Sequence, residues 1–168
     1  MTRIGLISDT HGYLDQKVLE YFKDCDEIWH AGDIGDANVS DKLSSVKKYR
    51  AVFGNVDGTE IRLMHPLVES FMCEEVNVLI LHIGGYPNHY SPDAKKLLQE
   101  KKPDLFISGH SHILKVVRDK DLNLLHINPG AAGKHGMHKM RTIVRFVING
   151  KRIEDLEVIE LGKRGAIE

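Results

Sequence analysis

The stretch RIGLISDTHG, residues 3–12, begins as an apolar run and ends in an acid and an imidazole. Residues 3–8 are almost continuously apolar, which is typical of a strand buried on both faces of a parallel sheet. Asp9 and His11 follow directly. Side chains two residues apart in an extended chain point to the same side, so we expect both to face one point. The stretch therefore predicts an α/β fold with polar groups at a strand end.

Strands and helices alternate on the C-terminal side of this stretch. The first half predicts strands at 3–8, 27–32 and 48–54, with helices at 14–23 and 38–46 between them. This alternation indicates parallel strands with helices outside. The second half predicts two strands within 68–83, a helix at 91–102, a strand at 103–109, and then hairpins, the last turning at Asn149–Gly150. We expect one domain, residues 1–168, of two packed sheets flanked by helices.

Composition and charge are those of an ordinary soluble protein. Of the 168 residues, 42% are hydrophobic and 28% are charged. The formal net charge of −1 gives no global attraction to nucleic acid or to a membrane surface. The apolar runs are too short to span a bilayer, and the N-terminus has no signal-peptide layout. The expected location is therefore the cytoplasm.

Polar clusters of one kind close almost every predicted strand. The carboxyl ends of the strands line one crevice in an open α/β sheet, so these groups should gather in one place. Imidazole nitrogen with carboxylate and amide oxygen suits Mn, Fe, Zn or Ni better than Ca or Mg. No thiolate belongs to the set, which argues against a structural zinc site. The candidate metal ligands are Asp9, His11, Asp33, Asn55, His82, His110 and His112.

Seven side chains are more than one metal ion usually needs. Two ions sharing a bridging carboxylate would use all seven, and such pairs lie about 3.5–4 Å apart in phosphoester-cleaving enzymes. Each fragment alone has a structural explanation: His82 as a core histidine, Asp9 with His11 as a helix cap, and residues 110–112 as a polar turn. Their joint occurrence at predicted strand ends favours a metal centre.

The order of these clusters resembles the calcineurin-like metallophosphoesterases. That family reads D-x-H, G-D-x-x-D, G-N, a lone His and G-H-x-H. Here the motifs are SDTHG (8–12), GDIGD (32–36), GNVDG (54–58), LHIGG (81–85) and GHSH (109–112). The short length and the NPG at 128–130 are similar to the small bacterial and archaeal phosphodiesterases of the family. The resemblance covers about residues 4 to 133.

The resemblance implies an α/β/β/α sandwich of four layers, with two mixed β-sheets between helices. It also implies a metal-dependent phosphodiesterase that acts on a small phosphodiester through a hydroxide bridging two divalent metal ions. Manganese is the most expected metal, with nickel, iron and zinc as alternatives. Asp33 and Asn55 then count as catalytic residues as well as ligands. One ion would be held by Asp9, His11, Asp33 and His112, and the second by Asp33, Asn55, His82 and His110.

The sequence departs from the larger members of the family after Asn55. Those members carry a histidine next, near the leaving group, and this chain has Val56. Two other histidines are candidate catalytic residues. His30, three residues before Asp33, would orient a ligand, and His89, in the loop after His82, would reach a leaving group. Loop histidines of this kind, His135 and His138 included, more often lie in solvent. We expect Asp57 to brace its loop rather than bind metal.

Two other functions stay open. A non-catalytic scaffold is one, because the scaffold subunit of eukaryotic retromer resembles this family but has lost metal-site residues; the intact set of seven here disfavours it. A phosphomonoesterase would need further cations for a dianion, and a basic patch could supply them, formed by Lys134, His135, His138, Lys139 and Arg141. Exposed C-terminal hairpins could pair between subunits, which makes a homo-oligomer a further option.

Overall fold

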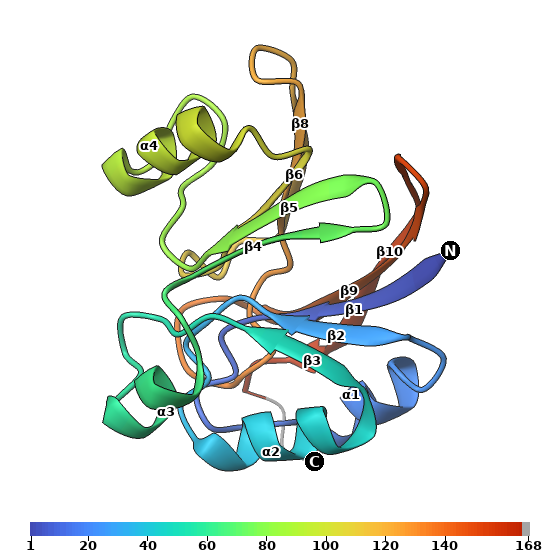
Figure 1. Cartoon of the computed structure of the whole chain (residues 1–168). Helices are drawn as coiled ribbons and strands as arrows, with labels where there is room; N and C mark the ends of the chain where they lie inside the picture. Colours follow the sequence, from blue (N-terminus) through green and yellow to red (C-terminus); the bar gives the residue numbers. More distant parts are fainter. Residues whose placement is uncertain (166–168) are drawn as a thin grey trace.

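Two mixed five-stranded sheets pack face to face in the computed structural model, which describes residues 1–165 (Figure 1). In the first sheet β1, β2 and β3 are parallel, and β9 pairs antiparallel with both β1 and β10. The strand order of this sheet is β10 (Arg152–Lys163), β9 (Met140–Asn149), β1 (Thr2–Ile7), β2 (Glu27–His30) and β3 (Lys48–Ala51).

The second sheet has three parallel strands, β5, β6 and β8, with an antiparallel strand at each edge. Its order is β4 (Val68–Cys73), β5 (Val76–Leu81), β6 (Leu105–Ile107), β8 (Leu124–Asn128) and β7 (Lys115–Asp119). Helices cover the outer faces, so the predicted four-layer sandwich of two mixed sheets is confirmed (Figure 1). The helices are α1 (Gln16–Tyr21), α2 (Ala37–Val46), α3 (Thr59–Met64) and α4 (Pro92–Lys101). Among residues 1–165, no helix is both long and apolar enough to cross a membrane.

Strand β1 is apolar throughout because both of its faces are covered. Ile4 and Leu6 point into the core between the sheets, whereas Ile7 packs with the helices on the outer face. Gly5 shares that outer face, and a Cβ atom there would lie 2.7 Å from the Phe22 ring. The predicted burial of this strand on both faces is therefore confirmed, and Gly5 makes room for the helical layer.

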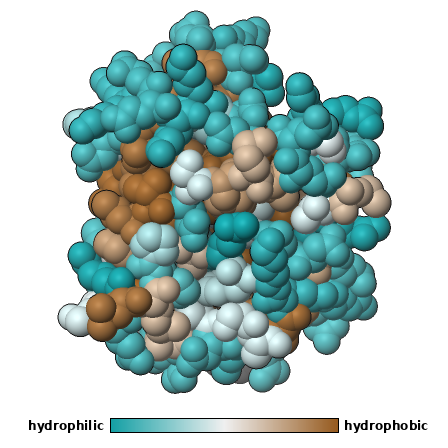
Figure 2. All heavy atoms as spheres, in the orientation of Figure 1, coloured by the Kyte–Doolittle hydropathy of each residue, from teal (hydrophilic) through white to brown (hydrophobic). Residues whose placement is uncertain are grey.

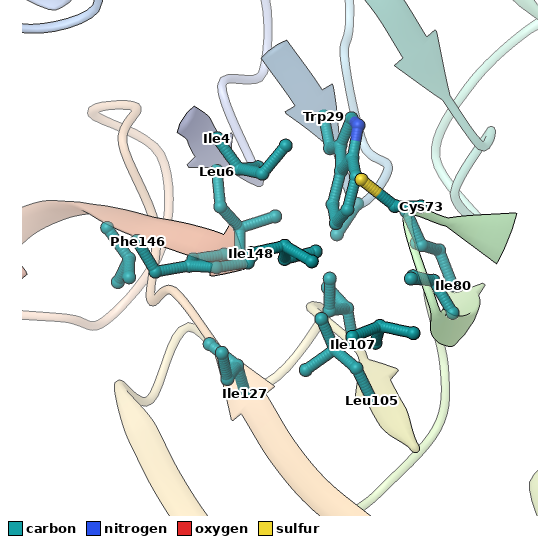
Figure 3. Packing of buried hydrophobic residues seen from close by; sticks show 14 of the residues in the cluster. Ile4, Leu6, Trp29, Cys73, Ile80, Leu105, Ile107, Ile127, Phe146 and Ile148 are labelled. Carbon is teal, nitrogen blue, oxygen red and sulfur yellow. The ribbon is translucent and has the colours of Figure 1, made fainter. Parts of the chain in front are cut away.

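The core between the sheets draws on side chains of both sheets. Figure 3 shows Ile4, Leu6 and Trp29 of the first sheet facing side chains of the second sheet, Ile80, Leu105 and Ile107 among them. All six are fully buried. Burying one such side chain contributes about 1.5–3 kcal/mol, so this layer holds the two sheets at a fixed spacing. The loops at the carboxyl ends of the strands consequently keep fixed relative positions.

Two helices differ from the sequence prediction. The predicted helix at 14–23 is shorter, because Asp15 caps its N-terminus and the chain leaves the helix at Phe22. No element was predicted between residues 55 and 67, yet α3 forms there. Its one buried residue is Ile61, which is too little apolar surface to produce a helical period in the sequence.

Arg141 does not belong to a surface basic patch. Its Nη1 donates a hydrogen bond to Asp15 Oδ2 at 2.9 Å, and both side chains are at most 3% exposed. The other carboxylate oxygen of Asp15 accepts the Lys17 amide and caps α1. The proposed role of Arg141 in holding substrate phosphate is therefore wrong. This arginine ties β9 to the start of α1.

We predict that Arg141→Met lowers the free energy of unfolding by about 3–5 kcal/mol, because it leaves the Asp15 carboxylate buried without its cation. Urea denaturation measures this change. The matched control is Arg152→Met, since Arg152 is 74% exposed and lies 3.9 Å from Glu154, where an ion pair contributes about 0–1 kcal/mol. Equal losses in the two variants would contradict the structural role of the buried pair.

Candidate metal centre

The loops that carry the predicted ligands meet at one edge of the sandwich and hydrogen-bond to one another through their main chains. The amides of Asp9 and His11, after β1, donate to the carbonyls of Gly32 and Asp33, after β2, both at 3.0 Å. In the second sheet, the Gly109 amide donates to the His82 carbonyl at 3.0 Å. These main-chain hydrogen bonds hold the loop after β1 against the loop after β2, and the loop after β5 against the loop after β6.

Six of the seven predicted ligands form two groups of three. The ligand atoms within each group all lie within 4.8 Å of one another. Asn55 lies with the second group, because its Oδ1 is 3.1 Å from Nδ1 of His110. The structure therefore brings all seven residues together. The first group is Asp9, His11 and His112, and the second is Asp33, His82 and His110.

Asp33 lies between the two groups. Its Oδ2 is 3.1 Å from His82 Nε2 in the second group and 3.7 Å from His11 Nε2 in the first. Its other oxygen, Oδ1, accepts the amide hydrogen of Val56 at 3.0 Å. One oxygen of this carboxylate thus faces both groups, which is the position that a bridging carboxylate occupies.

The donor set fits divalent metal ions. Asp9 Oδ1 and His82 Nε2 are buried, and within residues 1–165 neither has a hydrogen-bond partner. Such atoms cost about 1–3 kcal/mol each when nothing satisfies them. His112 Nε2 is 3.1 Å from Asp9 Oδ1 and 3.3 Å from His11 Nε2. Two atoms each about 2.1 Å from one ion, at tetrahedral or octahedral angles, would lie about 3.0–3.4 Å apart. These two spacings match that arrangement, whereas the third spacing of the group, 3.8 Å between His11 Nε2 and Asp9 Oδ1, is wider.

Charge at the centre is set by two buried carboxylates. Burial works to raise the pKa of Asp33, but the neighbouring imidazole of His82 and the hydrogen bond from the Val56 amide outweigh it and lower that pKa to about 2. Burial works to lower the pKa of His82, but Asp33 and Asp9 hold it above its ordinary value. The carboxylates therefore stay ionised and draw positive charge to this point, either as a proton on His82 or as a metal ion.

The main chain at the centre is strained. Left-handed φ is uncommon outside glycine and costs on the order of 1–3 kcal/mol per residue. Five of the seven candidate ligands adopt it, with φ between 45° and 69°: Asp9, His11, Asp33, His110 and His112. Strain of this kind gathers at functional sites, where surrounding contacts enforce it.

This conformation corrects the expectation drawn from an extended chain. Asp9 and His11 do converge, but a tight left-handed turn aims them rather than strand alternation. Strand alternation would likewise direct His110 and His112 to one side, but the structure separates them. His110 belongs to the group of Asp33, whereas His112 belongs to the group of Asp9. Strand alternation gives no signal for this division, because alternation ends where the strand ends; the family resemblance is what implied it.

Asp57 braces the loops, as its position predicted. Its buried carboxylate accepts the amides of Ile34 at 3.1 Å and Gly35 at 2.8 Å. The same carboxylate accepts the Gly54 amide at 2.8 Å. It therefore joins the loop that carries Asp33 to the loop that carries Asn55.

His30 and His89, the two predicted supporting histidines, lie in different surroundings. His30 is fully buried, and burial lowers its pKa to about 3. Its Nδ1 accepts the Gly32 amide at 3.1 Å, and its Nε2 is 3.0 Å from Thr10 Oγ1. It thus links the loops after β1 and β2 without reaching solvent. His89 is exposed, and its ring packs on Tyr86 with centroids 4.8 Å apart.

The loop at 133–138 packs on the first group, although the sequence favoured solvent positions for its histidines. The rings of His135 and His11 have centroids 4.9 Å apart, and those of His138 and His112 are 5.0 Å apart. A Cβ at Gly136 would lie 2.3 Å from His112 Nδ1. A glycine between two histidines after NPG is the one local signal that could have indicated this close approach.

The family model for the calcineurin-like phosphoesterase superfamily domain matches residues 2–151. A probable metallophosphoesterase of Methanocaldococcus jannaschii is 33% identical over 134 residues, covering 76% of this chain and 67% of that protein. A structure described as a novel archaeal phosphodiesterase superposes with a TM-score of 0.77 at 23% identity, covering 95% of this chain and 99% of that one. The structure of Vps29 from Entamoeba histolytica, complexed with Zn²⁺, superposes with a TM-score of 0.73 at 14% identity. The superposition covers 97% of this chain and 99% of that one.

Both structural likenesses show a shared fold and no more, because their identities are low. The family model, by contrast, spans most of the sequence and includes all seven residues of the candidate centre. The chain therefore belongs to the calcineurin-like phosphoesterase superfamily.

Proposed function

We propose that this protein is a phosphodiesterase that uses two divalent metal ions. The observation that carries the proposal is the position of Asp33, whose Oδ2 faces His11 of one ligand group and His82 of the other. A carboxylate in that position can serve two ions at once. Two ions supply positive charge to the phosphoryl oxygens and make water nucleophilic at neutral pH.

The chain's own side chains would divide the two ions between the groups. Asp9, His11 and His112 would hold one ion, and His82, His110 and Asn55 would hold the other, with Asp33 shared. This set offers four imidazoles beside two carboxylates and one amide, which suits manganese, nickel, iron or zinc. Manganese is the metal that we propose, with the other three as alternatives.

The two carboxylate oxygens of Asp9 have different surroundings. Its Oδ2 accepts hydrogen bonds from the Ser8 hydroxyl at 2.6 Å and from the His110 amide at 3.1 Å. Those donors fix the carboxylate plane and leave Oδ1 directed at the ligand nitrogens. Likewise His82 places its Nδ1 2.7 Å from the Ala31 carbonyl, which orients its Nε2 toward the carboxylates.

The surroundings favour a diester over a monoester. A phosphomonoester dianion would gain from extra cations beside the metals. Arg141 is buried against Asp15, and the ammonium of Lys134 lies 4.4 Å from the centroid of the Tyr13 ring. The basic patch expected at 134–141 is therefore reduced, which supports a singly charged phosphodiester as the substrate.

A second candidate function is a non-catalytic metal-binding protein. The structure of Vps29 with Zn²⁺ shares this fold, so metal binding alone does not establish hydrolysis. The presence of all seven donors, with Asp33 between the groups, supports hydrolysis instead. Only a measurement of turnover separates the two.

Gly54 allows the close approach that sets the position of Asp33. A Cβ at residue 54 would lie 2.2 Å from Asp33 Oδ1 and 2.4 Å from Asp33 N. Gly58, four residues further on, has nothing within 4 Å of the same point. The two glycines of GNVDG thus have different roles, and only the first is packed against the candidate bridge.

We predict that Gly54→Ala displaces Asp33, weakens Mn²⁺ binding at least about tenfold and lowers the free energy of unfolding by about 1–3 kcal/mol through overpacking. Isothermal titration calorimetry and urea denaturation measure the two effects. Gly58→Ala is the matched control and should stay within about 0.5 kcal/mol with unchanged Mn²⁺ affinity. An unchanged affinity in the first variant would show that Asp33 need not hold its present place.

We predict that Asp33→Asn lowers hydrolysis of bis(p-nitrophenyl) phosphate at least about a hundredfold and reduces binding from two Mn²⁺ per chain to one or none, because the shared ligand loses its charge. Metal content after dialysis and circular dichroism accompany the assay. Asp36→Asn is the control, since Asp36 is an exposed N-cap of the same motif and asparagine caps equally well. Activity retained in Asp33→Asn would refute the bridging role.

We predict that the Mn²⁺-loaded protein hydrolyses bis(p-nitrophenyl) phosphate faster than p-nitrophenyl phosphate, with Ni²⁺ also active, Mg²⁺ weakly active, and activity lost on treatment with a chelator. Parallel assays of both esters with each metal measure this. Faster monoester cleavage would favour the phosphomonoesterase. Two bound ions with no cleavage of either ester would favour the non-catalytic protein.

A further inference from the structure

Exposed apolar side chains stand directly beside the candidate ligands. Val56 follows Asn55, Ile83 follows His82 and Ile113 follows His112. Val56, Ile83 and Ile113 are 59%, 42% and 61% exposed, respectively. Met137, in the loop that packs on His112, is 97% exposed. Scattered apolar residues are normal on protein surfaces, but here four of them lie in the loops that carry or contact the candidate ligands.

Figure 2 shows hydrophobic atoms gathered on the side of the molecule at which β1, β2 and β3 end. The ligand-bearing loops lie on that same side. We name as the apolar rim the exposed residues of these loops: Val56, Ile83, Tyr86, Ile113 and Met137. They lie outside all three buried clusters of the protein, so packing of the core does not account for them.

The main chain fixes the rim as firmly as the centre. The Val56 amide donates to Asp33 Oδ1 at 3.0 Å, and the Ile113 amide donates to Ser111 Oγ at 3.2 Å. The carbonyl of Ile83 accepts the Ser91 hydroxyl at 2.8 Å. A rigid apolar surface loses little conformational entropy when a ligand covers it, so its burial contributes fully to affinity.

Tyr86 adds an aromatic wall to the rim. The ammonium of Lys115 lies 3.8 Å from the centroid of its ring, and the ring of His89 packs against it at 4.8 Å. These contacts connect the loop after β5 with the start of β7. They hold the ring in place while 39% of the residue stays exposed. This stack also gives His89 a role in supporting the rim.

We propose that the apolar rim binds an apolar ester group of the substrate, so that the preferred substrates are phosphodiesters in which one ester group is an aryl or extended alkyl group without polar substituents. This inference rests on the proposed phosphodiesterase function. A phosphodiester held at the candidate ligands must direct its two ester groups outward, and the side chains next to those ligands are apolar. Burial of about 55 Å² of apolar surface corresponds to about tenfold tighter binding.

The test uses two monoanions that share a head group and cannot be hydrolysed, dimethylphosphinate and diphenylphosphinate. Calorimetric titration of each into the Mn²⁺-loaded protein separates binding from turnover. We expect diphenylphosphinate to bind at least about tenfold more tightly. In the double variant Ile83→Ser and Ile113→Ser this preference should disappear while the dimethylphosphinate affinity stays unchanged, because neither side chain is a candidate ligand.

The matched control is Val46→Ser. Val46 is 48% exposed at the end of α2, before β3 begins, whereas the candidate centre follows the end of that strand. The control should keep the full preference for diphenylphosphinate. Circular dichroism of all variants verifies that each is folded.

Three outcomes would overturn the inference, and they are distinguishable. Equal affinities for the two phosphinates, with diester hydrolysis intact, would refute the preference for apolar ester groups without contradicting the proposed phosphodiesterase function. If neither phosphinate binds and no diester is hydrolysed, both the inference about the apolar rim and the proposed phosphodiesterase function are refuted. A dimer in sedimentation experiments that dissociates in the double variant, without a phosphinate preference, would identify the rim as an interface between copies of this chain.

Discussion

The candidate centre is assembled across the seam between the two sheets, and polar contacts over that seam set its geometry. His82 comes from the second sheet, yet its Nδ1 lies 2.7 Å from the carbonyl of Ala31 in the first. The amide of His110 likewise donates across the seam to Asp9 Oδ2. A Cβ at Gly109 would lie 2.3 Å from Ser8 Oγ, so the loops touch there. The geometry of the candidate centre therefore depends on the apolar core, which keeps the two sheets in fixed relative positions.

The same contacts give the two oxygens of each carboxylate different roles. In Asp9 and in Asp33 one oxygen accepts protein hydrogen bonds, and the other faces the imidazoles. This division holds the second oxygen in place before any ion arrives, at the cost of buried charge and left-handed main chain. The buried core, which draws on both sheets, offsets that cost. Stability and the preformed centre are thus linked through one layer of side chains.

Local patterns in the sequence predicted the parts of this protein that local physics determines. The apolar run at 3–8 marks a strand because both of its faces are buried, and the polar residues after the strands mark the centre. Contacts distant in sequence escaped prediction. Arg141 pairs with Asp15 across 126 positions, and nothing near either residue in the chain indicates the other. The partition of His110 and His112 was implied by the family resemblance and not by any local pattern, because it depends on a turn whose φ angles are set by its neighbours.

Residue 56 shows why the chemistry around the centre can change while the centre stays intact. Its main-chain amide donates to Asp33 Oδ1, and any residue except proline supplies that donor. Its side chain is exposed. The larger members of the family carry a histidine at this position, and this chain carries valine. The position therefore supports Asp33 through its backbone, while its exposed side chain is free to differ. That separation connects the proposed apolar rim to a candidate centre in which all seven predicted ligands are brought together.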